Sequence, residues 1–166
     1  MSVLSNDAAA KTAEAQLRAS AGDPAGVSGW MTVDQQRIDG FADITEDHQF
    51  LHVDVEAARR GPFGGTIAHG FLSLSLLSHM AETGRPPIKG ATALVNYGFD
   101  RVRFLAPVAA GSRVRARFTL AETTPRAAGQ VLFQYRVEVE IEGGERPALM
   151  ADWLVLALFD NKENAG

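Results

Sequence analysis

The sequence contains no cysteine. This absence excludes a disulfide framework, a thiolate zinc site and a cysteine nucleophile, and it fits a reducing compartment. The N-terminus also lacks the basic start and apolar core of a signal peptide. The longest apolar helix, expected near residues 70–81, is too short to span a bilayer. We therefore expect a cytoplasmic protein with no membrane partner.

The chain also has no large excess of charge of one sign. It carries 16 basic and 20 acidic residues, for a net charge of -4, which argues against nucleic acid as the main partner. Apolar residues make up 46% and charged residues 22%, as in ordinary globular proteins. The 166 residues are enough for one well-filled domain and too few for two of usual size.

Composition along the chain predicts three parts. Residues 1–29 form a helical arm and a connector, because residues 7–20 are good helix formers with few large apolar side chains and GDPAG at 22–26 is rich in turn residues. Residues 30–160 form the folded domain. Residues 161–166 are a polar C-terminal tail.

The first part of the domain is predicted to be helical. Thr32 to Gln35 has the form of a capping box and predicts a helix over 32–44, followed by a loop over 46–53. Asp54 can cap a short helix that runs through Arg60. The main helix is predicted over 69–83; its apolar residues lie on nearly every side, which is typical of a helix that is mostly buried.

From residue 91 onward the apolar period changes to two. Alternation over 112–120 and 131–141 predicts half-buried antiparallel strands, and a change of phase beside Gly98 predicts a bulge in the strand before them. The last strand, 149–159, is apolar on both faces, so it is central or lies at an interface. These elements predict an α+β protein with a single hot dog fold, in which a curved antiparallel β-sheet wraps around a long central helix.

Residues 41–72 contain three of the four histidines and the residue types of an acid/base site. Asp47 and His52 are five residues apart on the predicted loop, and each can act as a general acid or base. The backbone N–H of Gly70, at the predicted start of the main helix, can stabilise developing negative charge. Taken singly, Asp47 also fits a turn-capping carboxylate and His52 a buried structural histidine. The spacing matches no HExxH or EF-hand motif, and no metal is expected.

Two motifs with a fixed gap carry a family resemblance. DHQFLHVD at 47–54, followed by FGGTIAHGFL at 63–72, resembles the signature of the MaoC-like, (R)-specific (type 2) enoyl-CoA hydratases. That family usually has Asn and Pro where this chain has Gln49 and Phe50. The departure is similar to the nodulation protein N-like branch, as is NYGFDRVRFLAPV at 96–108. The resemblance covers about residues 30–158.

The resemblance implies a single hot dog unit that dimerises and a role in fatty acid metabolism. The implied activity is the reversible addition of water to trans-2-enoyl thioesters, which yields (3R)-3-hydroxyacyl thioesters. Asp47 and His52 match the family's catalytic pair, and together they can hold one water. The N–H of Gly70 can donate to the thioester oxygen. No cofactor is implied, because coenzyme A is part of the substrate.

Other residues are predicted to contact the substrate. His69 either orients the thioester or has a structural role. An apolar acyl chain needs an apolar slot, which the main helix can provide through Phe71, Leu74, Leu77, Ser78 and Ala81. Lys89, Arg101 and Arg103 can meet the phosphates of coenzyme A, although a solvated basic strand face explains these residues equally well.

Alternatives to the hydratase remain open on sequence grounds. A hot dog acyl-CoA thioesterase would cleave the thioester with a carboxylate and water, and the shared fold does not separate the two enzymes. A non-catalytic acyl-thioester binding protein or a dehydratase subunit is a third reading. The carrier is coenzyme A or acyl carrier protein. We also expect a homodimer, because a single sheet leaves one edge open and the apolar strand from Trp153 to Phe159 would be exposed.

Overall fold

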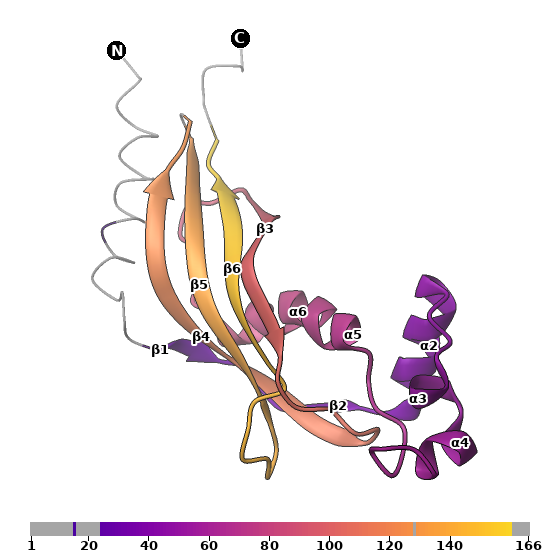
Figure 1. Cartoon of the computed structure of the whole chain (residues 1–166). Helices are drawn as coiled ribbons and strands as arrows, with labels where there is room; N and C mark the ends of the chain where they lie inside the picture. Colours follow the sequence, from indigo (N-terminus) through magenta and orange to yellow (C-terminus); the bar gives the residue numbers. More distant parts are fainter. Residues whose placement is uncertain (1–14, 16–23, 128, 161–166) are drawn as a thin grey trace, which may run out of the picture.

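A curved antiparallel sheet forms most of the molecule (Figure 1). The computed structural model describes residues 15, 24–127 and 129–160, so the predicted tail and all but one residue of the predicted arm lie outside the described residues. The strands are β1 (Pro24–Val27), β2 (Met31–Val33), β3 (Ala93–Phe104), β4 (Ser112–Pro125), β5 (Gln130–Ile141) and β6 (Leu149–Leu158). The helices are α2 (Gln35–Thr45), α3 (Phe50–Val53), α4 (Val55–Arg59), α5 (Gly70–Ser75) and α6 (Leu77–Gly84).

The four long strands confirm the period-two prediction. The order in the sheet is β1-β4-β5-β6-β3, with β2 also paired to β4. Alternate residues of β4 are buried while those between them are half-buried or exposed, which is the pattern of a sheet with one face on a core. The strands β1 and β2 were not predicted, because three or four residues are too short to show a period. β1 adds residues 24–27, assigned above to the connector, to the sheet.

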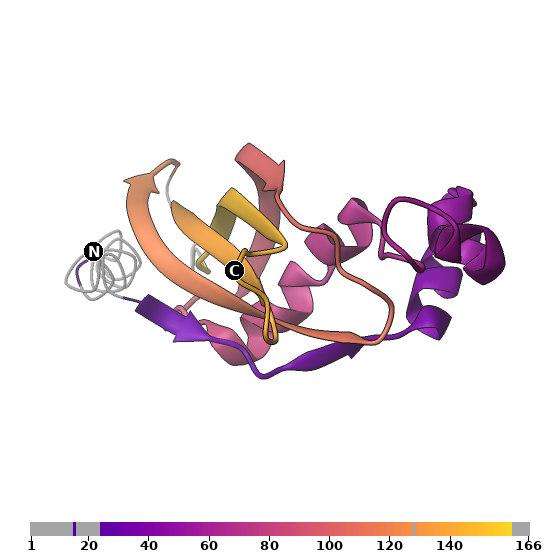
Figure 2. The same ribbon diagram turned by 60° about the horizontal axis from the view of Figure 1, so that its bottom comes forward.

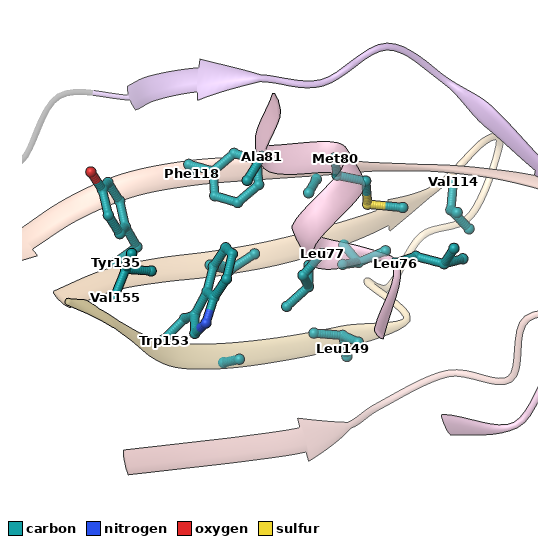
Figure 3. Close-up of a cluster of buried hydrophobic side chains, with 14 of the residues drawn as sticks. Leu76, Leu77, Met80, Ala81, Val114, Phe118, Tyr135, Leu149, Trp153 and Val155 are labelled. Atoms are coloured by element: carbon teal, nitrogen blue, oxygen red, sulfur yellow. The ribbon is translucent and has the colours of Figure 1, made fainter. Parts of the chain in front are cut away.

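The main helix lies against the concave face of the sheet (Figure 2). Its residues Leu76, Leu77, Met80 and Ala81 pack with side chains from β4, β5 and β6 (Figure 3). Burying a large apolar side chain of this kind contributes roughly 1.5–3 kcal/mol, so the contact between helix and sheet is the main source of the fold's stability.

The predicted helix over 69–83 is present, and it differs from the prediction in two details. The helix is divided into α5 and α6 at Leu76. Leu76 still has right-handed helical dihedrals, and the bonds from its N–H to Leu72 and from the N–H of Met80 to its own carbonyl carry the helix through this position. In addition, the side chain of Phe71 is 68% exposed, so α5 has a free outer face.

The helices before α5 also differ in detail from the prediction. The N-cap of α2 is Asp34, which accepts from the N–H of Arg37 at 2.9 Å, whereas Thr32 belongs to β2. The predicted loop 46–53 contains the short helix α3. The cap at Asp54 is confirmed: its carboxylate accepts from the N–H of Ala57 at 2.8 Å and starts α4. Figure 1 shows α2, α3 and α4 gathered beyond the α5 end of the main helix.

β3 forms an open edge of the sheet. The bulge predicted beside Gly98 is confirmed by shifts in register between Asn96 and Gly98 and between Phe99 and Arg101. β6 lies between β5 and β3, so its central position is confirmed and it is not the exposed strand. The exposed apolar side chains of the edge belong instead to β3: Leu94, Val95, Tyr97, Phe99 and Phe104. Among the helices of the described residues, none has both the length and the apolarity needed to cross a membrane.

Candidate active site

His52 is held in one tautomer by a backbone contact. It lies on α3, which replaces the predicted loop, and its side chain is 8% exposed. Its Nδ1 lies 2.7 Å from the carbonyl oxygen of Ile67. A carbonyl oxygen only accepts, so Nδ1 carries the proton and Nε2 of the neutral ring is an acceptor. The geometry therefore leaves His52 able to take a proton through Nε2.

Asp47 and His69 lie beside His52. Helix α2 ends at Glu46, whose backbone is left-handed (φ 60°), and this turn places Asp47 directly after the helix. Asp47, His52 and His69 each offer a side-chain N or O atom, and these atoms lie within 4.8 Å of one another. A carboxylate and an imidazole at this spacing can share one water. The structure thus brings Asp47 and His52 together, and their catalytic role stays a prediction.

His69 fixes both members of this pair. Its ring is 2% exposed, and Nε2–H donates to the main-chain oxygen of Asp47 at 2.9 Å. The ring also stacks on His52, with centroids 3.8 Å apart and planes at 27°. Phe41 covers the ring of His69 at 5.1 Å. These contacts favour a structural role for His69 over a direct contact with the thioester, and the choice between the two stays a prediction.

The same three residues could in principle hold a metal ion. A carboxylate with two imidazoles is a donor set that transition metals accept. Backbone carbonyls take Nδ1 of His52 and Nε2 of His69, so Nε2 of His52 and Nδ1 of His69 would have to be the ligands. The stacking of the rings argues against this, because ring nitrogens bind a metal in the ring plane and the lone pairs of stacked rings do not converge on one ion. The expectation of no metal stays a prediction.

Gln35 has a role that the sequence did not predict. Its amide nitrogen donates to the main-chain oxygen of His52 at 2.7 Å, and its amide oxygen accepts from the hydroxyl of Thr66 at 2.5 Å. This bridge joins α2 to α3 and to the segment before α5. The signal in the sequence was a polar residue at the same helical spacing as the buried Ile38 and Ala42, three and seven positions later.

The start of α5 forms another wall of the site. The first N–H groups of a helix have no partner within it, and α5 has no side-chain cap. Gly70 and His52 both line a cavity of about 370 Å³, which we call the His52 cavity; Asp47 is exposed and is not part of its lining. A Cβ atom built on Gly70 would lie 3.1 Å from the ring of Phe104. Packing against Phe104 therefore favours glycine here, because any other residue would have to displace the ring slightly.

The predicted substrate contacts fall in several places. Ser78 and Ala81 line a second cavity of about 590 Å³, which we call the Trp153 cavity. Leu77 is 1% exposed and belongs to the core, whereas Leu74 is half-buried against it. Phe71 contacts the ring of Phe104, with centroids 6.0 Å apart, from the outer face of α5.

The basic residues are also separated from one another. Arg101 and Arg103 line a third cavity of about 250 Å³ with Arg136 and Asp152. Leu105 lines both this cavity and the His52 cavity, so the arginines lie next to the candidate site. Lys89 is exposed in the segment between α6 and β3. The assignment of these three cations to coenzyme A stays a prediction.

The comparisons with known proteins identify the family of this chain. The model of the MaoC-like domain matches residues 16–141. The chain belongs to the MaoC-like dehydratase family. Nodulation protein N of Rhizobium leguminosarum bv. viciae is 56% identical to this MaoC-like protein over 140 residues, which cover 84% of this chain and 87% of the relative.

A second relative carries an enzyme name. The 3-hydroxyacyl-thioester dehydratase Z of Mycobacterium tuberculosis is 45% identical over 141 residues, covering 85% of this MaoC-like chain and 93% of the relative. A solved MaoC-like dehydratase from Rhodospirillum rubrum has a TM-score of 0.71 at 22% identity and covers 85% of this chain and 94% of that chain. This likeness supports the fold, and the single hot dog prediction is confirmed.

Proposed function

We propose that this protein catalyses the reversible hydration of trans-2-enoyl thioesters to (3R)-3-hydroxyacyl thioesters. The observation that carries the proposal is the tautomer of His52: its bond to Ile67 leaves Nε2 as an acceptor, on a ring that lies close to the carboxylate of Asp47 and lines the same cavity as Gly70. The dehydratase name of the Mycobacterium tuberculosis relative supports the same reaction for this chain.

The proposed chemistry needs one water and no other reagent. Water held by Asp47 and His52 attacks C3 of the enoyl group while Nε2 of His52 takes one of its protons. The electron pair of the C2–C3 double bond moves toward the thioester, and the resulting enolate oxygen accepts from the N–H of Gly70. The proton that the pair has taken is then delivered to C2, which restores the site. Dehydration is the same sequence in reverse.

The carrier part of the substrate would leave the site past Leu105. The cavity with Arg101 and Arg103 adjoins the His52 cavity there, and guanidinium groups bind phosphates well. Coenzyme A and acyl carrier protein both present their thioester on a phosphate-bearing arm. Weaker binding of coenzyme A thioesters by Arg101→Gln and Arg103→Gln, seen as a higher KM at unchanged kcat, would support this placement.

We further propose that two copies pair through β3. This strand is the open edge of the sheet and exposes five large apolar side chains, a combination that pairs readily with another chain. Light scattering at micromolar concentration should give the mass of a dimer. Tyr97→Lys should lower that mass toward a monomer, whereas Trp30→Lys, on β2's side of the sheet, should not.

The reaction can be tested on crotonyl-CoA with two simultaneous readings. Loss of the enoyl absorbance without release of free thiol is the expected result and means hydration. Release of thiol would instead identify a thioesterase. Binding of crotonyl-CoA by calorimetry with neither spectral change would identify a non-catalytic thioester-binding protein, and either of these last two results would overturn the proposal.

A further inference from the structure

The Trp153 cavity lies farther along the main helix than the candidate site. It is bounded by α6, by the segment that follows it, and by β3 and β6. Eleven residues separate Gly70 from Ala81, a span of about 16 Å along a helix. The cavity is therefore placed where the far end of an acyl chain would lie if its thioester were held at Gly70. Its lining includes Ser78, Ala81, Arg85, Leu94, Asn96 and Trp153.

Trp153 lines this cavity and carries an unused hydrogen-bond donor. Its side chain is 4% exposed, and Figure 3 shows it rising from β6 on the side of the sheet that faces α6. The indole nitrogen is buried and has no acceptor among the described residues. An indole N–H only donates, and a buried donor without an acceptor is unfavourable. An acceptor supplied by a ligand would remove that penalty.

Arg85 provides a second unused donor in the same cavity. Its Nε is buried and has no acceptor in the part of the chain that the structure describes. Its Nη1 donates to the hydroxyl of Tyr135 at 3.3 Å, and its guanidinium lies 5.3 Å from the centre of that ring. The structure gives Arg85 a phenol and an aromatic face, but no carboxylate within ion-pair distance among the described residues.

The neighbouring ionisable groups do not compensate the charge of Arg85. Glu82 lines the cavity, but its carboxylate lies 3.7 Å from Nδ1 of His79 and makes no ion pair with Arg85. Burial raises the pKa of the Tyr135 phenol, and Arg85 offsets only part of that rise, so Tyr135 stays neutral. A half-buried cation of this kind favours an incoming oxygen, and an anionic one most of all.

We propose that the Trp153 cavity binds the far end of an acyl chain that carries an acceptor oxygen, held by the N–H groups of Trp153 and Arg85. This inference rests on the proposed function and specifies its substrate class: oxygen-bearing enoyl thioesters in preference to plain alkyl ones. The oxygen is that of a carboxylate or of a ketone. Both groups accept from the same two donors, and the experiment separates them.

The test compares three trans-2-enoyl-CoA substrates of equal length. Each has about fourteen carbons, long enough when extended to follow the roughly 16 Å between Gly70 and Ala81, and they end in a methyl group, a methyl ketone or a carboxylate. For the natural sequence we expect kcat/KM to be about tenfold higher for at least one oxygen-bearing substrate than for the methyl-ended one. The reason is that a methyl group leaves the donors of Trp153 and Arg85 without an acceptor. The identity of the preferred substrate names the oxygen.

Variants assign the preference to its two donors. Trp153→Phe keeps an aromatic ring and removes the N–H, and Arg85→Met keeps a long stem and removes the guanidinium. Each should bring the ratio of kcat/KM for the oxygen-bearing substrate to kcat/KM for the methyl-ended one close to one. Arg85→Lys keeps a positive charge and should retain part of the preference for the carboxylate. Trp30→Phe and Arg126→Met, which lie outside the cavity lining, serve as matched controls and should keep the ratio of the natural sequence.

The possible failures are distinguishable. Equal kcat/KM values for the three substrates overturn this inference and leave the hydratase intact. A preference that survives in both folded variants, Trp153→Phe and Arg85→Met, overturns the assignment to these donors. If no enoyl thioester is hydrated, the proposed function fails, and calorimetry of the same three thioesters decides instead: tighter binding of an oxygen-bearing one supports the cavity, and equal binding overturns it. Thermal unfolding of each variant identifies those that have lost their fold.

Discussion

The polar groups near the two ends of the main helix differ in whether they have hydrogen-bond partners. At the α5 end, His52 and His69 are each fixed by a hydrogen bond to a backbone carbonyl, and Gln35 ties α2 to the main chain of His52. At the α6 end, the donors of Trp153 and Arg85 have no acceptor among the described residues. The first arrangement would preorganise the proposed reaction centre, because its groups need not move to act. In the proposal above, the second arrangement leaves donors for a ligand, and such unpaired donors would let the cavity select among substrates.

The sharpest test of this comparison removes the acid/base pair at the α5 end. Asp47→Asn and His52→Ala should each lower kcat by about 100-fold or more, the usual scale for a general acid or base. The double variant should lose much less than the product of the two, because groups that act on one water are non-additive. Steady-state kinetics with crotonyl-CoA measures both effects.

Stability separates this outcome from a structural role. The side chain of Asp47 is exposed, so Asp47→Asn should leave the free energy of unfolding unchanged. His52 is buried and bonded to Ile67, and His52→Ala should lose roughly 1–2 kcal/mol. Near-normal kcat in either folded variant would rule out the mechanism proposed here.

His69 tests whether the α5 end is preorganised. His69→Phe keeps a ring for the stack on His52 and for Phe41, but it loses the bond to the main chain of Asp47. We expect kcat to fall about tenfold at nearly unchanged KM, because a small displacement of a reacting group has a large effect on rate. His69→Gln, which retains a donor, should recover part of the loss. Equal activity of the two variants would show that the bond has no positioning role.

The α6 end should respond to chain length instead. Ser78 lines the Trp153 cavity, and Ser78→Leu adds volume there. The kcat/KM for a twelve-carbon enoyl-CoA should fall roughly fivefold more than that for crotonyl-CoA, since loss of an apolar slot of this size has effects of that order. His79→Leu, one position along on the same exposed side of α6, is the matched control. An unchanged chain-length profile would remove Ser78 from the acyl-binding surface.

The difference between local and non-local information explains what the sequence could predict. The strands β4 and β5 were predicted because alternation is a property of neighbouring residues, and the pair of Asp47 and His52 was found because its motif is contiguous. The role of Gln35 was missed because Thr66 is 31 positions away and meets it only when the segment before α5 folds back over α2. The exposure of β3 was missed for the same reason, since strand order is set by pairing with β6 and not by the residues of β3 itself.

Gly70 gives the smallest and most discriminating effect, because packing and chemistry make different predictions for it. A Cβ atom there would lie 3.1 Å from the ring of Phe104, so Gly70→Ala should lower the free energy of unfolding by about 1 kcal/mol and reduce kcat only a fewfold. Phe104→Leu shortens the neighbouring side chain and removes the clash. In that background Gly70→Ala should therefore lower the free energy of unfolding much less than it does when Phe104 is present. Recovery of kcat together with stability would mean that glycine serves the packing of α5 against β3 while the N–H still reaches the thioester. A kcat that stays low in the stable double variant would mean that the thioester itself passes over Gly70, as a backbone donor at the start of α5 requires.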